Sequence, residues 1–283
     1  MTKTGMNADL EVFKHYEELT KWCQKREGQP TPWVTMLYGS QNYGLESADS
    51  DVDTKTMLLP SLKMVVGDTK RISTEVVMPD GSLDNCKDLR EMFENYLKGN
   101  INFVETLYTR YYTCTELYHD EYRELREQRD LIANAQPRRL LHMAAGMAKQ
   151  KYEAFEHPFE GKKDVLAKWG YDPKQLHHLV RLYYFMAEYY AHQDFESALL
   201  CCHKQVDADT YKYVMGFKVY PYPYQQAKEF RDYFMDRVDG LVAQADAHTP
   251  TDNGYEEAKA FLHGLALRLI TKHLRKEVLA TCG

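Results

Sequence analysis

Two residue pairs near the N-terminus, Gly39-Ser40 and Asp51-x-Asp53, have the composition of a phosphate and metal site. A glycine lets a ligand approach the backbone, and a helix that starts near Ser40 would point free N–H groups at an anion. Two carboxylate side chains that are two positions apart on a strand project from the same face. Their mutual repulsion favours a hard cation such as Mg²⁺ between them. The combination predicts transfer of a nucleotidyl or phosphoryl group.

Each pair alone has a simpler interpretation. Gly-Ser is common in turns, and an Asp-x-Asp pair in a loop is most often solvated or caps a helix. Here the pairs lie close together, and an apolar strand is expected on each side, over residues 33–37 and 52–59. The combination therefore favours a ligand-binding or catalytic site.

The elements that must position these residues can be read from periodicity. Residues 10–26 carry apolar side chains at helical spacing, and residues 70–84 form a hairpin pattern around a Pro-Asp-Gly turn. From about residue 115 the pattern is helical almost to the end. We therefore predict an α+β protein, with a small mixed β-sheet domain over residues 1–115 and an all-α domain over residues 116–283.

A second group of polar residues lies on one predicted helix. Lys174, His178 and Arg181 are spaced i, i+4 and i+7, beside an apolar stripe and after Asp172, which is placed to cap the helix. Three cationic groups in a row suit a triphosphate or an RNA backbone. A solvated helix face is the alternative interpretation.

The motif residues also resemble a known family. Gly39-Ser40, Gly44 and Ser50-Asp51-Val52-Asp53 are similar to the signature of the nucleotidyltransferase superfamily typified by DNA polymerase beta. More narrowly, they resemble the predicted nucleotidyltransferases of bacteria and bacteriophages. The stretches 98–107 and 168–182 resemble further signatures of that family, although Ile101 replaces an expected proline. Asn100 and Asn102 in the first stretch are expected to cap a helix, with contact to a ligand as the alternative.

The resemblance implies roles for individual residues. Asp51, Asp53 and a third acid would hold two Mg²⁺ ions, with Mn²⁺ as a possible substitute. The third acid is expected on the hairpin, where Asp84 is the first choice and Glu75 the alternative, because spacing does not decide between them. The helical domain would close over the nucleotide. The nucleotide-binding residues implied are Gly39, Ser40, Tyr43, Gly44, Ser50, Lys174, His178 and Arg181.

The expected activity is transfer of an NMP from an NTP to a hydroxyl acceptor, with release of pyrophosphate. An RNA 3′ end, such as that of tRNA, is weakly favoured over a protein or small-molecule acceptor; the net charge of −6 disfavours binding of long nucleic acids. One alternative is a catalytically silent nucleotide-binding sensor, for example in phage–host defence. Another is a metal-dependent phosphohydrolase, which is disfavoured because the nearest histidines are His15 and His119.

Composition adds expectations about location. The chain has no apolar run of about eighteen residues and no signal-like N-terminus, which predicts a cytoplasmic protein without membrane contact, in a bacterial or phage-infected cell. Its six cysteines, Cys282 among them, form no Cys-x-x-Cys pair and are expected to be reduced thiols. The sequence does not predict an oligomeric state.

Overall fold

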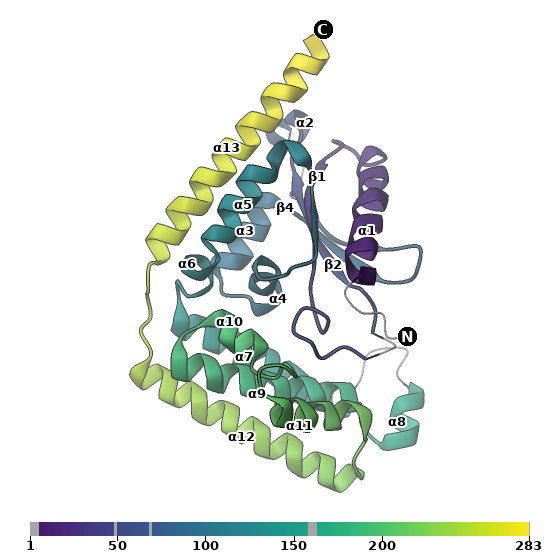
Figure 1. Cartoon of the computed structure of the whole chain (residues 1–283), viewed down its shortest axis with the longest axis vertical. Coiled ribbons are helices and arrows are strands. Elements are labelled where there is room, and N and C mark those ends of the chain that lie inside the picture. The colour runs from purple at the N-terminus through teal and green to yellow at the C-terminus, as the bar shows by residue number, and fades with distance from the viewer. Residues whose placement is uncertain (1–5, 48–49, 68–69, 158–162, 283) are drawn as a thin grey trace.

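The computed structural model describes residues 6–47, 50–67, 70–157 and 163–282, and the side chains of residues 8–279 within these ranges. The side chain of Cys282 therefore lies outside the described residues. Figure 1 shows two groups of elements, a sheet lobe that contains the N-terminal part and a helical lobe below it. The predicted α+β class, a small mixed sheet followed by helices, is confirmed.

The sheet has five strands in the order β3-β4-β2-β1-β5. The β2 and β4 strands are parallel, whereas the other neighbours are antiparallel. The predicted hairpin is present as β3 and β4, and its turn contains Gly81 with a φ of 90°. The strands are β1 (Thr31–Leu37), β2 (Thr54–Leu59), β3 (Ser73–Val77), β4 (Leu83–Asp88) and β5 (Tyr112–Cys114).

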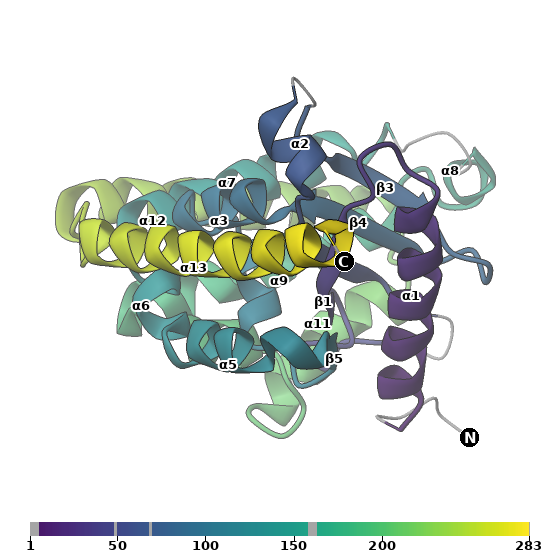
Figure 2. The same cartoon turned by 90° about the horizontal axis from the view of Figure 1, so that it is seen from above.

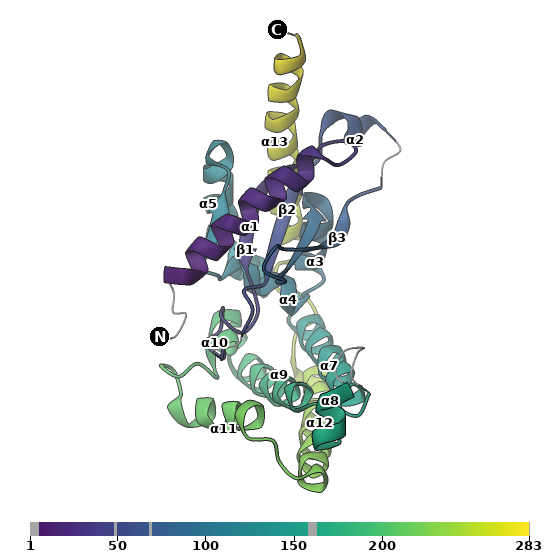
Figure 3. The same ribbon diagram turned by 90° about the vertical axis from the view of Figure 1, so that its right-hand side faces the viewer.

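Helices cover both faces of the sheet. The predicted N-terminal helix, α1 (Met6–Gln24), crosses the strands on one face and packs Leu19 and Cys23 against Leu58 (Figure 3). On the other face lies α3 (Leu89–Leu97), which the Asp88 side chain caps by accepting a hydrogen bond from the Arg90 N–H. Because successive strand residues point to opposite faces, the two faces of β2 meet different helices.

Short elements connect the sheet lobe to the helical lobe. Gly99 has a φ of 68° and ends α3. Asn100 occupies the N-cap position of the next helix but makes no capping hydrogen bond through its side chain, and Asn102 lies inside that helix, so the predicted side-chain caps are wrong. These elements are α2 (Leu62–Val66), α4 (Ile101–Val104), η1 (Glu105–Leu107), η2 (Glu116–Tyr118), α5 (His119–Glu127) and α6 (Arg129–Ala133).

The helical lobe is built around α9 (Pro173–His192), which contacts α7, α10, α11 and α12. Asp172 caps α9 as predicted, because its Oδ1 accepts a hydrogen bond of 2.9 Å from the Lys174 N–H. The other helices are α7 (Pro137–Glu153), α8 (Lys163–Trp169), α10 (Phe195–Leu200), α11 (Ala208–Val219) and α12 (Tyr224–His248).

The last helix, α13 (Tyr255–Cys282), returns from the helical lobe to the sheet lobe. Seen from above, it runs beside α3 and α5 (Figure 2). The Tyr118 hydroxyl and His273 Nδ1 lie 2.9 Å apart in a buried hydrogen bond, which joins η2 to α13. The predicted domain boundary near residue 115 stays a prediction, and α13 packs across it.

One predicted element is wrong. No helix starts near Ser40; the chain instead forms consecutive turns, in which Asn42 N–H donates to Gly39 O and Leu45 N–H donates to Ser40 O. A glycine with a φ of 87° at position 39 and another with a φ of 74° at position 44 bend the backbone more sharply than helical dihedrals allow.

None of the helices in the described ranges combines the length and apolar character needed to cross a membrane.

Candidate active site

A cleft of about 350 Å³ lies where the two lobes meet, and we call it the central cleft. One wall comes from the turn after β1 and the residues before β2, and the other comes from α7, α9 and α11. Its lining residues are Tyr38, Gly39, Ser40, Tyr43, Ser47, Ser50, Asp51, Asp53, Asn102, Glu105, Met147, Lys151, Lys174, His177, His178, Arg181, Leu182 and Lys218.

The turn after β1 presents Gly39 and Ser40 to the cleft. A side chain at Gly39 would have no atom within 4 Å, so the glycine leaves open space beside the backbone. The Gln41 side-chain amide donates a hydrogen bond of 3.2 Å to the Asp51 carbonyl oxygen and so ties the turn to the paired carboxylates. The Gly-Ser pair and the Asp-x-Asp pair therefore share one wall, as the sequence predicts.

Asp51 and Asp53 lie directly before β2, with Asp51 exposed and Asp53 half-buried. The Asp53 Oδ1 accepts a hydrogen bond of 3.2 Å from the Leu83 N–H of β4, which fixes this carboxylate. Burial raises the pKa of Asp53, the Leu83 amide opposes that rise, and the neighbouring Asp51 charge adds to it. A cation between the two carboxylates would remove that repulsion.

Four cationic side chains line the opposite part of the cleft: Lys151, Lys174, Arg181 and Lys218. None of them forms an ion pair with any residue that the structure describes. Burial lowers the pKa of Lys151, and the positive charges of Lys174 and Arg181 lower it further. Lys218 shows the same pattern, since burial and then Lys174 lower its pKa. Crowded, unpaired cations of this kind would be stabilised by an anion.

Two adjacent histidines complete this side of the cleft. The buried His177 donates from Nδ1 to the Val214 carbonyl oxygen over 3.0 Å, and burial lowers its pKa to about 4. Burial also places the pKa of His178 well below its usual range, with His177 and Arg181 adding to the effect. Both rings are therefore neutral near pH 7, and His177 must carry its proton on Nδ1 because a carbonyl oxygen only accepts.

The structure does not bring Asp84 into the cleft. In the parallel pair of β2 and β4, Thr54 lies opposite Asp84, so both side chains project from the face of the sheet that α1 covers. The Asp84 carboxylate is fully buried and accepts hydrogen bonds from the Thr54 hydroxyl (2.6 Å), the Thr56 hydroxyl (2.8 Å) and the Cys86 thiol (2.9 Å). Glu75 is exposed on β3 and does not line the cleft either. The third acid stays a prediction.

Gly44 has a different place from the one predicted. It does not line the central cleft; a side chain there would meet His203, with a Cβ only 2.1 Å from the ring carbon Cδ2. Gly44 therefore lets the turn pack against the helical lobe. The other nucleotide-binding residues named from the sequence do line the cleft: Gly39, Ser40, Tyr43, Ser50, Lys174, His178 and Arg181.

Sequence reasoning did not assign several polar residues of the cleft to the site, among them Asn102, Glu105, Lys151 and Lys218. The first two stand in the family-like stretch 98–107, which could have marked them. Lys151 stands on α7 and Lys218 on α11, both outside the motifs named from the sequence; the contact of Lys218 shows why. Its Nζ donates to the Leu45 carbonyl oxygen over 2.8 Å, a contact between lobes that sequence spacing does not encode.

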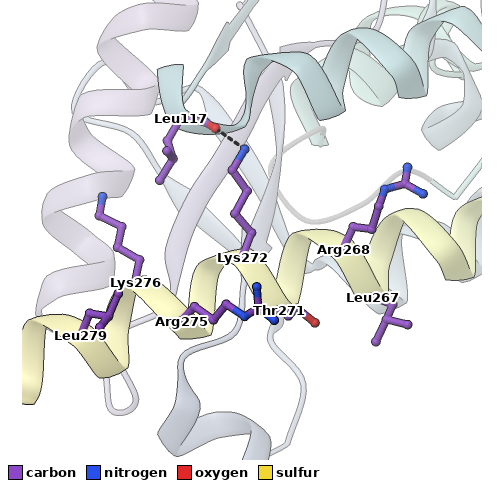
Figure 4. Close-up of a pocket in the computed structure, with 8 residues that line it drawn as sticks. All are labelled: Leu117, Leu267, Arg268, Thr271, Lys272, Arg275, Lys276 and Leu279. Carbon is purple, nitrogen blue, oxygen red and sulfur yellow. Dashed lines mark hydrogen bonds between the residues drawn. The ribbon is translucent and has the colours of Figure 1, made fainter.

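Two further observations bear on other sites. Within the described ranges, no group of three or more His, Cys, Asp or Glu side chains is arranged to hold a metal ion. A larger hollow, of about 610 Å³, follows α13 and shares no residue with the central cleft (Figure 4). It is lined by leucines and cations, and Lys272 Nζ donates across it to the Leu117 carbonyl oxygen.

Comparison with known proteins gives one family. The family described as "RlaP: RNA repair pathway DNA polymerase beta family" matches residues 17–193, which include the whole sheet, both motif pairs and α9. A search of the curated proteins gave no match. The matched segment covers more than half of the chain and supplies both walls of the central cleft except Lys218.

The packing of Gly44 against His203 predicts a stability effect. Gly44→Ala would impose a φ of 74° on a non-glycine residue and a clash with the ring. We expect a loss of about 2–4 kcal/mol of unfolding free energy, measured by urea denaturation. Gly81→Ala is the matched control, since it has a φ of 90° but no atom within 4 Å, and should cost only about 1 kcal/mol. Equal losses would contradict the contact.

The buried His177 predicts an acid-sensitive stability. Its folded-state pKa of about 4 lies below the unfolded value, so the folded state loses stability as pH falls from about 6.5 toward 4. His177→Asn keeps a donor for Val214 but removes the titration. Urea midpoints at pH 7 and pH 4 should show a smaller acid loss in this variant, by up to about 3 kcal/mol. The exposed His119→Asn should behave as wild type; a wild-type slope in His177→Asn would refute the assignment.

Proposed function

The chain belongs to the RNA repair pathway DNA polymerase beta family, and we propose that it transfers an NMP from an NTP to a hydroxyl acceptor and releases pyrophosphate. Nucleotidyltransferase activity in general follows from the family. The acceptor, the nucleotide and the metal are parts of the proposal. The observation that carries it is the group of four unpaired cations facing the Gly39-Ser40 turn and the Asp51-Asp53 pair across one cleft.

The charges of the cleft suit a triphosphate. Lys151, Lys174, Arg181 and Lys218 provide positive charge, which an NTP would balance without displacing any existing ion pair among the described residues. Ser40 adds a hydroxyl donor, and the open space at Gly39 admits phosphate oxygens close to the backbone. A neutral or cationic ligand would leave this positive charge unbalanced, which favours a polyanion.

The carboxylate pair fits a magnesium ion in its donor chemistry. Asp51 and Asp53 supply hard oxygen ligands, and Mg²⁺ commonly takes one or two carboxylates together with phosphate oxygens and water. Such an ion would withdraw charge from the phosphates and lower the pKa of an attacking hydroxyl. The carboxylates on this wall support a site for one ion; the two-ion arrangement requires a third acid, and neither of the predicted candidates, Asp84 and Glu75, lines the cleft.

Residues of the chain would act at the α-phosphate and at the leaving pyrophosphate. The Leu83 amide holds Asp53 in place beside the α-phosphate, where the acceptor oxygen forms its bond to phosphorus. The acceptor hydroxyl gives up its proton to water, the bond between the α-phosphorus and the bridging oxygen breaks, and pyrophosphate leaves with the electron pair. Lys174 and Arg181, fixed on one face of α9, would offset the charge that develops on that leaving group.

An RNA end is the acceptor that we favour. The matched family is described by an RNA repair pathway, and a terminal hydroxyl of RNA supplies the required nucleophile. The formal charge of −6 fits an acceptor that enters only by its end better than a long nucleic acid that lies along the surface.

Loss of the paired carboxylates should abolish turnover without unfolding the protein. We expect Asp51→Asn/Asp53→Asn to lower Mg²⁺-dependent pyrophosphate release from the preferred NTP by about 10²-fold or more. The assay uses each of the four NTPs with and without total cellular RNA. Asp236→Asn/Asp239→Asn on the exposed face of α12 makes the same charge change outside the cleft and should keep full activity.

The outcomes separate the candidate functions. Release that requires RNA and disappears in the Asp51/Asp53 variant supports the proposal and its acceptor class. Retained activity in that variant contradicts the assignment of the carboxylates. Tight NTP binding without release, with RNA, protein or small-molecule acceptors all supplied, would indicate a nucleotide-binding sensor instead.

The anion site predicts a loss of affinity when one cation is removed. Lys151→Met should weaken NTP binding by roughly 10- to 100-fold, the range for hydrogen bonds to charged groups, and leave the melting temperature unchanged or higher because repulsion is relieved. Lys149→Met is the matched control, since Lys149 is exposed on the same helix and outside the cleft. Calorimetric titration would test both; equal affinities in the two variants would contradict the site.

A further inference from the structure

One buried acid of the central cleft has no role so far. Glu105 is the first residue of η1, directly after α4, and is 2% exposed although it lines the cleft. Its backbone oxygen accepts a hydrogen bond of 2.9 Å from the Asn42 side-chain amide, which joins η1 to the Gly39-Ser40 turn. The carboxylate is thus held on a rigid element beside the turn that faces the phosphates.

The carboxylate of Glu105 has an open hydrogen-bonding position. Its Oε2 is buried and has no hydrogen-bond partner, although buried polar atoms in folded proteins nearly always have one. Burial raises the pKa of Glu105, and Arg181, Lys55, the Gly39 amide and the Asn42 side chain oppose that rise; neither cation forms an ion pair with it in the described part of the chain. When ionised, this carboxylate can only accept hydrogen bonds.

The same cleft also contains a buried hydrogen-bond donor that has no partner. Arg181 is 6% exposed, its guanidinium lies 4.0 Å from the Tyr43 ring centroid, and its Nε is buried without a hydrogen-bond partner. The cleft therefore holds an unfilled acceptor on η1 and an unfilled donor on α9. A ligand that fills both must present an anionic oxygen to Arg181 and a hydrogen-bond donor to Glu105.

A ribonucleotide has this combination. Its phosphate oxygens accept, and its ribose hydroxyls are the first donors along the molecule beyond the triphosphate. Carboxylates bind ribose hydroxyls in the same way in dinucleotide-binding folds. Donors on the nucleobases differ from one base to another and lie farther from the phosphates. The position of Glu105 beside the phosphate-facing turn therefore favours the sugar.

We infer that Glu105 accepts a hydrogen bond from a ribose hydroxyl of the bound NTP and makes the protein discriminate against nucleotides that lack that hydroxyl. This inference rests on the proposed function, because it takes an NTP as the ligand of the central cleft. A site built around a hydroxyl rejects the analogue that lacks it, since the buried acceptor is then left without a partner.

The first test uses the wild-type protein. Each NTP is titrated calorimetrically beside its 2′-deoxy and 3′-deoxy counterparts, with Mg²⁺ present. We expect one deoxy series to bind roughly 10- to 100-fold more weakly, and the series that does so identifies the hydroxyl. If no NTP binds, the proposed function fails. If NTPs bind and both deoxy series bind equally well, only the ribose inference fails.

The second test assigns the selectivity to Glu105. In Glu105→Gln the penalty for the deoxy nucleotide should fall to below about fivefold, because a neutral acceptor makes a weaker hydrogen bond. Asp88→Asn neutralises another buried carboxylate, which caps α3 outside the cleft, and should keep the full penalty. Glu105→Asp, which withdraws the carboxylate but keeps its charge, should show the same relaxation and replaces the Gln variant if that does not fold.

Two results would overturn the assignment even if the wild type is selective. An unchanged deoxy penalty in the Glu105 variants would mean that another group recognises the ribose. An equal loss of affinity for the ribonucleotide and its deoxy counterpart would mean that Glu105 only positions the turn or the arginine. Loss of turnover without any change in either affinity would instead make it a proton acceptor for the reaction.

Discussion

Repulsion among unpaired cations in the central cleft is the interaction on which the proposed function depends. Burial lowers the pKa values of Lys151 and Lys218, and the charge of Lys174 lowers both further, yet no ion pair to these cations is found in the described part of the chain. Lys218 bonds to a backbone carbonyl and Arg181 lies over the Tyr43 ring. An incoming polyanion would convert this unfavourable charge density into binding energy at the junction of the lobes.

The sequence predicts most elements of the fold because their signals are local. The hairpin follows from a turn sequence between apolar strands, and the capped helix α9 follows from Asp172-Pro173 before an apolar stripe. The turns at Ser40 and the orientation of Asp84 could not be predicted in this way. The register of a parallel pair is set by packing over a long connection, so the face that Asp84 occupies is fixed only by tertiary structure.

The residues of the central cleft also divide into those that a local sequence signal predicts and those that only tertiary packing brings together. Ser40 and Lys174 lie in short motifs that mark them as site residues, and the structure brings both to the cleft. Lys218 and Glu105 come from a separate helix and a single 3-10 turn, and they reach the cleft only because the lobes pack together. No periodic pattern encodes such an approach, since it depends on how the lobes dock.

The path of α13 has a consequence for how the protein is made. This helix covers the sheet lobe beside α3, yet it begins only at Tyr255, after the whole helical lobe. During synthesis the strands leave the ribosome long before Leu262, Leu265 and Leu269 are available to shield the apolar surface that they cover in the finished protein. The sheet lobe can therefore reach its final packing only after the residues of α13 have left the ribosome, and until then the apolar surface that α13 covers is open to other chains.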